Sequence, residues 1–232
     1  MRSSAQIAAM FVAAAIGSPV AAVTLGETDT FSSSSEGWFI GGGPGGFPAT
    51  ALTVAPTGGP SGAGDAYLQL TSTGSSGPGS RLVANNATQW TGNYIGAGVT
   101  AIEMDLNNFG TTDLTIRLLF EDPGVGPPTN IAATTFGAPL PAASGWTHVR
   151  FSIAPGDLTT VAGNVTAALS GATFFRLFHN TAPEFPPLLG PPPIAAILGV
   201  DNISAVPEPS AAVIMLLGLG AIGMAVRRKR AR

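Results

Sequence analysis

Residues 102–107 read Ile-Glu-Met-Asp-Leu-Asn, and residues 114–120 read Leu-Thr-Ile-Arg-Leu-Leu-Phe. In both stretches apolar residues recur at every second position, with Glu, Asp, Asn, Thr or Arg between most of them. Residues 148–153 alternate in the same way, with Val149, Phe151 and Ile153 as the apolar members. An extended chain points successive side chains to opposite faces, so each stretch predicts a β-strand with one buried and one solvated face.

Further strands are expected on both sides of these three. Gly and Pro recur at short intervals through the chain and bound four more apolar runs, at Tyr67–Thr71, Ser80–Ala84, Thr173–Phe178 and Ile197–Ser204. Seven or more short strands without repeats or intervening helices predict an all-β fold, an antiparallel β-sandwich of the jelly-roll type. The one helical competitor is Thr159–Ser170, where Asp157 is expected to cap a short turn.

The C-terminal segment has three parts. Pro207-Glu208-Pro209 precedes an uncharged run from Ala211 to Val226, and four cationic residues follow from Arg227 to Arg230. As a helix, the run has a length of about 24 Å at 1.5 Å per residue. With interfacial Arg and Lys at its end, it predicts a C-terminal transmembrane helix whose basic end stays in the cytoplasm.

This three-part order resembles the PEP-CTERM sorting signal of Gram-negative bacteria. The resemblance assigns Pro207, Glu208 and Pro209 as the sorting motif. It implies an exosortase, a membrane protease or transpeptidase, as processing partner, with a transient inner-membrane intermediate before the cell surface or extracellular matrix. The alternative is an ordinary single-span anchor with a proline-rich entry.

The N-terminus predicts export as well. Arg2 is followed by an apolar segment from Ile7 to Ile16, by Gly17-Ser18-Pro19, and by small residues up to Ala22. These are the parts of a secretory signal peptide, with cleavage expected after Ala22. The predicted organisation is a signal peptide at 1–22, a β-sandwich ectodomain at 23–205 and a sorting segment at 206–232.

The charge of the body excludes one class of partner. Residues 23–206 hold 12 acidic and 4 basic residues, a formal charge of −8. A surface of this sign repels nucleic acid. Cysteine is absent, so no disulfide stabilises the exported domain.

Three stretches also resemble the opening, middle and closing strands of jelly-roll carbohydrate-binding modules. They are Asp29-Thr30-Phe31 with Gly37-Trp38, Gly64–Leu68 and Leu198–Ile203. The resemblance implies a structural calcium ion (Ca2+) near the first and last strands, with Asp29, Asp65 and Asp201 as ligands and Glu27 as a further one. The alternative places these carboxylates in turns or on solvated strand faces.

Aromatic residues offer stacking platforms for a polysaccharide, although large aromatics in a sandwich more often fill the core. The candidates are Trp38, Trp90, Tyr94 and Trp146. Because Trp90-Thr91-Gly92-Asn93-Tyr94 lacks strand alternation and contains Gly and Asn, Trp90 and Tyr94 are the predicted ligand-binding residues.

Catalytic groups are few. His148 is expected on the surface and His179 in a loop, while Glu103 and Asp105 share a strand face roughly 7 Å apart. We therefore expect an exported, non-enzymatic surface or extracellular-matrix protein. The alternatives are a calcium-supported module that binds matrix or environmental polysaccharide and, third, a polysaccharide-active enzyme.

Overall fold

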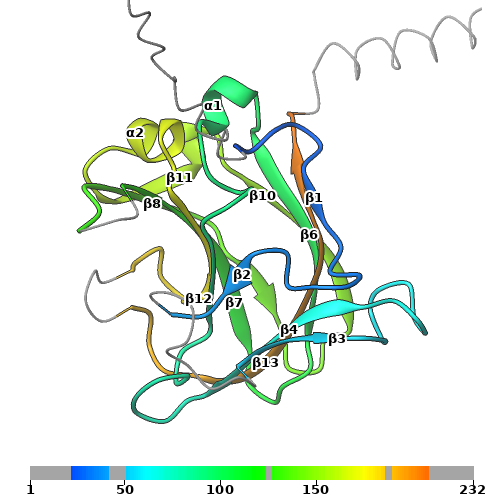
Figure 1. Cartoon of the computed structure of the whole chain (residues 1–232). Coiled ribbons are helices and arrows are strands. Elements are labelled where there is room, and N and C mark those ends of the chain that lie inside the picture. Colours follow the sequence, from blue (N-terminus) through cyan, green and yellow to red (C-terminus); the bar gives the residue numbers. More distant parts are fainter. Residues whose placement is uncertain (1–21, 42–50, 124–126, 186–189, 209–232) are drawn as a thin grey trace, which may run out of the picture.

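The computed structural model describes residues 22–41, 51–123, 127–185 and 190–208, which form two antiparallel sheets packed face to face (Figure 1). The predicted all-β sandwich is confirmed. The predicted transmembrane helix and all but the last residue of the predicted signal peptide lie outside the described residues. Within those residues, every helix is too short or too polar to span a bilayer.

The first sheet, sheet A, places the last strand of the chain at its centre. Its strand order is β10-β6-β13-β4-β3, and β1 pairs with β13 in addition. The strands are β1 (Thr28–Asp29), β3 (Leu52–Ala55), β4 (Tyr67–Thr73), β6 (Ala101–Asn108), β10 (Trp146–Ser152) and β13 (Ala195–Val206). Since β13 pairs with β1, β4 and β6, sheet A depends on the C-terminal strand.

The second sheet, sheet B, has the order β11-β8-β7-β12-β5-β2, with β9 paired to β7. Its strands are β2 (Trp38–Phe39), β5 (Val83–Asn86), β7 (Leu114–Asp122), β8 (Asn130–Thr134), β9 (Ala138–Leu140), β11 (Leu158–Ala162) and β12 (Phe174–His179). The short helices α1 (Tyr94–Ala97) and α2 (Val165–Ser170) and a 3-10 turn at Pro155–Asp157 complete the elements. Figure 1 shows α1 at the end of the sandwich where both ends of the described chain lie.

Two local predictions are wrong in detail. The helix expected at Thr159–Ser170 begins only at Val165, because residues up to Ala162 pair with β8 as strand β11. Its N-cap is Asn164, whose Oδ1 accepts the Ala167 N–H at 3.1 Å, and not Asp157. The strand expected at Ser80–Ala84 begins at Val83 instead.

The alternating residues fill the space between the sheets. Ile102, Met104 and Leu106 of β6 are fully buried there, as are the even-numbered apolar residues of β7. Leu119 faces the other way and joins a second cluster with Phe178 and Phe185 on the outer face of sheet B. Sheet B therefore buries apolar side chains on both faces.

A buried carboxylate links the first strands to the approach to α1. Asp29 is 3% exposed, and its Oδ2 accepts the indole N–H groups of Trp38 at 2.7 Å and Trp90 at 2.6 Å. Gln89 Nε2 donates to both of its oxygens, at 3.0 and 3.1 Å. Burial raises the pKa of the Asp29 carboxyl, and these hydrogen bonds oppose the rise.

We predict that Asp29→Ala lowers the free energy of unfolding by about 2–5 kcal/mol, because two buried indole N–H groups lose their acceptor. Denaturant unfolding measures the loss. The exposed Glu184 supplies a control, Glu184→Ala, which is expected to unfold at the wild-type concentration. An Asp29→Ala midpoint equal to that of the wild type would contradict the structural role.

Candidate binding site

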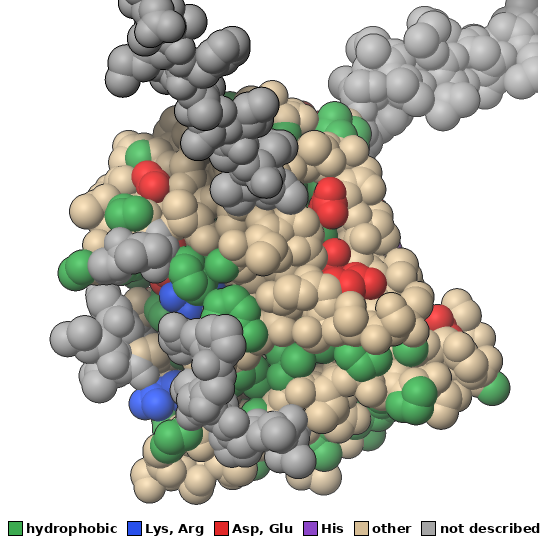
Figure 2. Space-filling model, in the orientation of Figure 1, with side chains coloured by type: hydrophobic (Ala, Val, Ile, Leu, Met, Phe, Trp, Pro, Cys, Tyr) green, Lys and Arg blue, Asp and Glu red, His purple; other side chains and the backbone are tan. Residues whose placement is uncertain are grey.

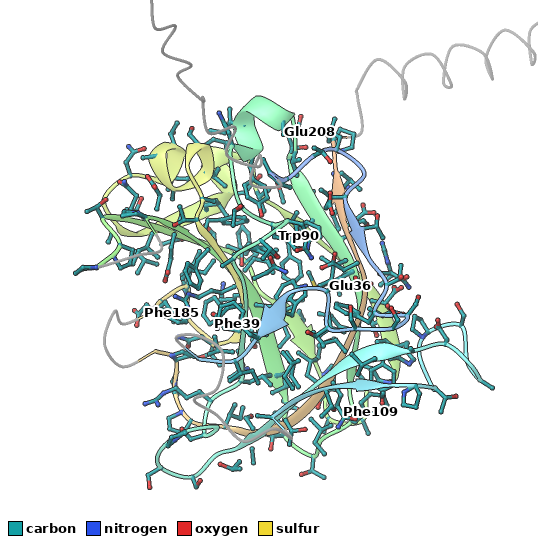
Figure 3. The ribbon with its side chains drawn as sticks, in the orientation of Figure 1. Glu36, Phe39, Trp90, Phe109, Phe185 and Glu208 are labelled. Atoms are coloured by element: carbon teal, nitrogen blue, oxygen red, sulfur yellow. The ribbon has the colours of Figure 1, made fainter. Side chains whose placement is uncertain are left out.

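A pocket of about 160 Å³ lies on the outer face of sheet B. It is bounded by β5 and β12 and by three loop segments, and its lining residues are Ile40, Gly41, Gly77, Gly79, Ser80, Arg81, Val83, Asn85, Arg176, Phe185, Gly190 and Pro191. Figure 3 shows Phe39 and Phe185 on this side of the molecule, away from Glu208 at the end where the chain leaves. The pocket thus combines an aromatic ring with a few polar groups, the usual composition of a small-ligand site.

Arg176 is fixed in the floor of the pocket. Its Nε and Nη2 donate to the two carboxylate oxygens of Glu121 at 3.0 and 2.7 Å, and Nη1 donates to Asn85 Oδ1. Its guanidinium carbon lies 4.8 Å from the centre of the Phe174 ring and 5.4 Å from that of Phe185. Glu121 neutralises the charge of Arg176, so this arginine orders the site and adds little net charge to it.

Arg81 is a partly exposed arginine whose charge no carboxylate of the described residues neutralises. Ion pairs among the described residues join carboxylates to Arg150, Arg176 and His148, and none joins Arg81. Arg117, also without a carboxylate, donates instead to four backbone carbonyl groups. The Nε of Arg81 donates to the Pro191 carbonyl at 2.7 Å, which holds the partly exposed side chain at the pocket. Arg81 therefore brings an uncompensated positive charge to the site.

Ser80 is a buried residue of the lining. The residue is 1% exposed, and its Oγ has no hydrogen-bond partner in the part of the chain that the structure describes. A buried hydroxyl without a partner costs free energy, and because the Oγ atom is itself buried it offers no surface to a ligand in the pocket. Asn85 belongs to β5, and Ser80 and Arg81 lie in the segment just before this strand.

Trp90 and Tyr94 are not ligand platforms in this structure, contrary to the sequence prediction. Both are 0% exposed, because Trp90 binds Asp29 and the Tyr94 ring packs edge-on against Phe120 at 4.9 Å. The Tyr94 hydroxyl donates to the Trp90 carbonyl at 2.7 Å. Asn93, which suggested an exposed loop, caps α1 by accepting the Gly96 N–H.

Trp146 is the one partly exposed residue among the four aromatics considered from sequence. On the outer face of sheet A it contacts Tyr67 and Phe109, with ring centres 5.2 and 5.9 Å apart, and it donates to the Gly58 carbonyl. A Cβ at Gly199 would lie 2.7 Å from the Phe109 ring and 2.8 Å from the Trp146 ring. The rings therefore pack down on the backbone of β13 and against one another.

The three carboxylates expected to bind calcium have different environments. Asp29 does not fit a cation site, because N–H donors point at both of its oxygens. Asp65 accepts the Ser61 N–H at 2.7 Å within its own turn. Over the described ranges, no three or more His, Cys, Asp or Glu side chains form a group that could hold a metal ion.

Asp201 and Asp65 do lie within electrostatic reach of each other. Asp201 is 1% exposed on β13, and its Oδ1 accepts the Asn202 N–H at 2.8 Å. Burial, together with the charges of Asp65, Asp105 and Glu36, raises the pKa of Asp201 to about 7. The outer face of sheet A is therefore acidic at this position.

The remaining candidates for catalysis are engaged in structural contacts. On the outer face of β6, Glu103 pairs with Arg150, and Asp105 binds the Asn202 amide and the exposed His148. His179 ends β12 instead of lying in a loop, and its Nδ1 accepts the Thr115 N–H at 2.9 Å. Burial lowers the pKa of His179.

Pro207 and Glu208 follow β13 directly and are exposed, whereas Pro209 lies outside the described residues. Residues 205–230 match a family model for the PEP-CTERM protein-sorting motif. The C-terminal segment is a PEP-CTERM sorting motif. Such a motif indicates export and sorting to the cell surface, and it implies processing by an exosortase.

Solved structures similar to this chain include carbohydrate-binding modules. The family 11 module from Clostridium thermocellum, in complex with a β-1,3-1,4-mixed-linked tetrasaccharide, is 12% identical, with 79% of this chain and 97% of that chain covered and a TM-score of 0.47. The CBM22-1 xylan-binding domain of Xyn10C from Paenibacillus barcinonensis is also 12% identical, with 80% and 99% covered and a TM-score of 0.45. At this identity the likeness concerns the fold. A search of curated proteins found no match.

The raised pKa of Asp201 predicts a pH-dependent stability. The folded state holds the Asp201 proton up to about pH 7, and the unfolded state releases it near the ordinary value of 3.8, so the contribution to stability falls as pH rises between these values. Asp201→Asn keeps the Oδ1 acceptor but does not titrate. We expect its melting temperature to exceed that of the wild type at pH 8 and to depend less on pH. Asp113→Asn, at an exposed site, is the control and should follow the wild type.

Melting also tests calcium. Because Asp29 does not fit a cation site, we expect the same melting temperature in calcium and in EDTA. If calcium raises the melting temperature of the wild type but not that of Asp201→Asn, the ion binds at Asp201 and this expectation is wrong.

Proposed function

We propose that this protein is an exported, non-enzymatic surface protein that binds acidic polysaccharide in the pocket on the outer face of sheet B. The single observation that carries the proposal is Arg81. Among the described residues this cation has no carboxylate partner, and it lines a pocket that also holds an aromatic ring. The sorting motif supports the location, because it delivers the domain to where extracellular polysaccharide occurs.

The chemistry of the lining suits a sugar. A sugar ring has apolar C–H faces and a rim of hydroxyl groups, so it binds best between an apolar wall and a few placed donors and acceptors. Phe185 and Val83 supply the apolar wall, and the partly exposed Arg81 guanidinium supplies hydrogen-bond donors. At about 160 Å³ the pocket suits one ring of a chain and not an enclosed oligosaccharide.

The charge distribution supports an acidic sugar. A body of formal charge −8 repels a polyanion as a whole, so a uronate needs a local cation to bind. A guanidinium with nitrogens free of carboxylate can form paired hydrogen bonds with the carboxylate of such a sugar. In the view of Figure 2, the basic atoms lie beside hydrophobic side chains on the left, while acidic atoms lie mostly to the right, with one acidic patch at the upper left.

The lining supports binding without catalysis. The described residues around the pocket are Gly, Pro, Ser, Asn, Arg, Ile, Val and Phe, none of which titrates near neutral pH to serve as a general base. The nearby carboxylate of Glu121 is held by both Nε and Nη2 of Arg176. Most glycoside hydrolases use a pair of carboxyl groups, and the described lining of this pocket contains none.

Affinity electrophoresis tests the function. Polygalacturonate in the gel is expected to retard the wild-type protein, whereas fully methyl-esterified polygalacturonate, which keeps the sugar and loses its charge, retards it little. We expect Arg81→Gln to weaken binding about tenfold or more, as the loss of a charged hydrogen bond predicts, and Phe185→Ala to weaken binding to both polymers.

The matched control is Arg150→Gln, which removes an arginine from the other sheet and should leave retardation unchanged. Equal retardation by the charged and esterified polymers would overturn the acidic specificity. The function at this pocket would be overturned if neither polymer retards the wild-type protein, or if the Arg81→Gln variant binds like the wild type.

A further inference from the structure

The sorting motif begins on the folded sandwich, without an intervening linker. Val206, the last residue of β13, pairs with Ala101 of β6, and its carbonyl accepts the Thr100 N–H at 3.1 Å. The next residue is Pro207, the first of the motif. The backbone ladder of sheet A therefore reaches the motif itself.

One side chain extends this attachment into the motif. Arg150 Nη2 donates to the Pro207 carbonyl at 3.0 Å, and Arg150 Nη1 pairs with Glu103. Arg150 and Glu103 are cross-strand neighbours on β10 and β6, so the pairing register of two long strands sets the position of the guanidinium. Their side chains are 33% and 26% exposed, which makes the contact a reversible one.

The segment between β13 and the apolar run is short, so a contact that holds one of its residues affects how much of it a processing enzyme can reach. Four residues, 207–210, separate the end of β13 from the apolar run that begins at Ala211. Fully extended, four residues reach about 14 Å at most. For an enzyme that binds the motif as an extended peptide, a common mode of peptide recognition, each residue held by the sandwich shortens the segment that the enzyme can take up.

We propose that Arg150 and Glu103 form a restraint on the sorting motif: they hold Pro207 against the folded sandwich and thereby limit the access of the membrane-embedded processing enzyme. Cleavage is then fastest when the Arg150–Pro207 contact opens. The restraint is independent of the polysaccharide pocket, which lies on the outer face of the other sheet.

Pulse-chase labelling of the full-length chain, in a bacterium that contains the cognate processing enzyme, measures the conversion of precursor to mature protein. We expect Arg150→Gln to be converted about two- to tenfold faster than the wild type, the range set by one modest hydrogen bond. Arg150→Lys keeps a positive charge beside Glu103 but lacks the forked guanidinium that also reaches Pro207, so it should be converted nearly as fast as Arg150→Gln.

A second variant separates access from general loss of stability. Insertion of Gly-Ser between Val206 and Pro207 lengthens the accessible segment in a wild-type sandwich, and we expect it to speed conversion as Arg150→Gln does. In that background Arg150→Gln should have no further effect. Asp113→Asn, at an exposed site outside both the pocket and the restraint, is the control and is expected to be processed at the wild-type rate.

Three outcomes would overturn the restraint. They are conversion of Arg150→Gln at the wild-type rate, slower conversion of this variant, and a full additional effect of Arg150→Gln in the insertion background. None of these measurements involves polysaccharide, so a failure of the restraint and a failure of the binding function are distinguished by separate assays.

Discussion

The sandwich depends on a single buried carboxylate. Asp29 receives the indole N–H groups of Trp38 and Trp90, and so joins β1, β2 and the approach to α1 at one point between the sheets. Because β1 pairs with β13 and β2 pairs with β5, the same carboxylate relates the central strand of sheet A to the pocket edge of sheet B. One side chain thus connects a strand of sheet A with a strand of sheet B and with the segment before α1.

The long strands with alternating apolar residues were predictable from sequence, whereas the shorter strands β3, β8, β9 and β11 and the roles of the polar and aromatic residues were not. Half-buried strands such as β6 and β10 leave a period of two that any short window contains. Asp29 was assigned to a calcium site from a resemblance to carbohydrate-binding modules, and its actual indole donors could not be recognised because they lie 9 and 61 residues further along the chain. Trp90 and Tyr94 resembled an exposed loop for the same reason, since the Phe120 and Phe175 rings that cover them belong to distant strands.

The pocket could not be predicted from sequence, because the residues that line it are far apart along the chain. Arg81 and Pro191, which form one of its hydrogen bonds, are 110 residues apart, and Arg176 lies between them in sequence but on another strand. Only the pairing of β5 with β12 brings these arginines into one lining. The sorting motif, in contrast, is contiguous, and therefore the sequence was sufficient to identify it.

The central place of β13 has a consequence for the order of events during secretion. A chain that enters the export channel from its N-terminus delivers residues 195–206 after every other strand, yet β1, β4 and β6 all need these residues as a partner. Sheet A therefore remains open until almost the whole body has crossed. Sheet A is thus completed only by the last strand to arrive, whereas the strands of sheet B, which end by His179, are all delivered before it.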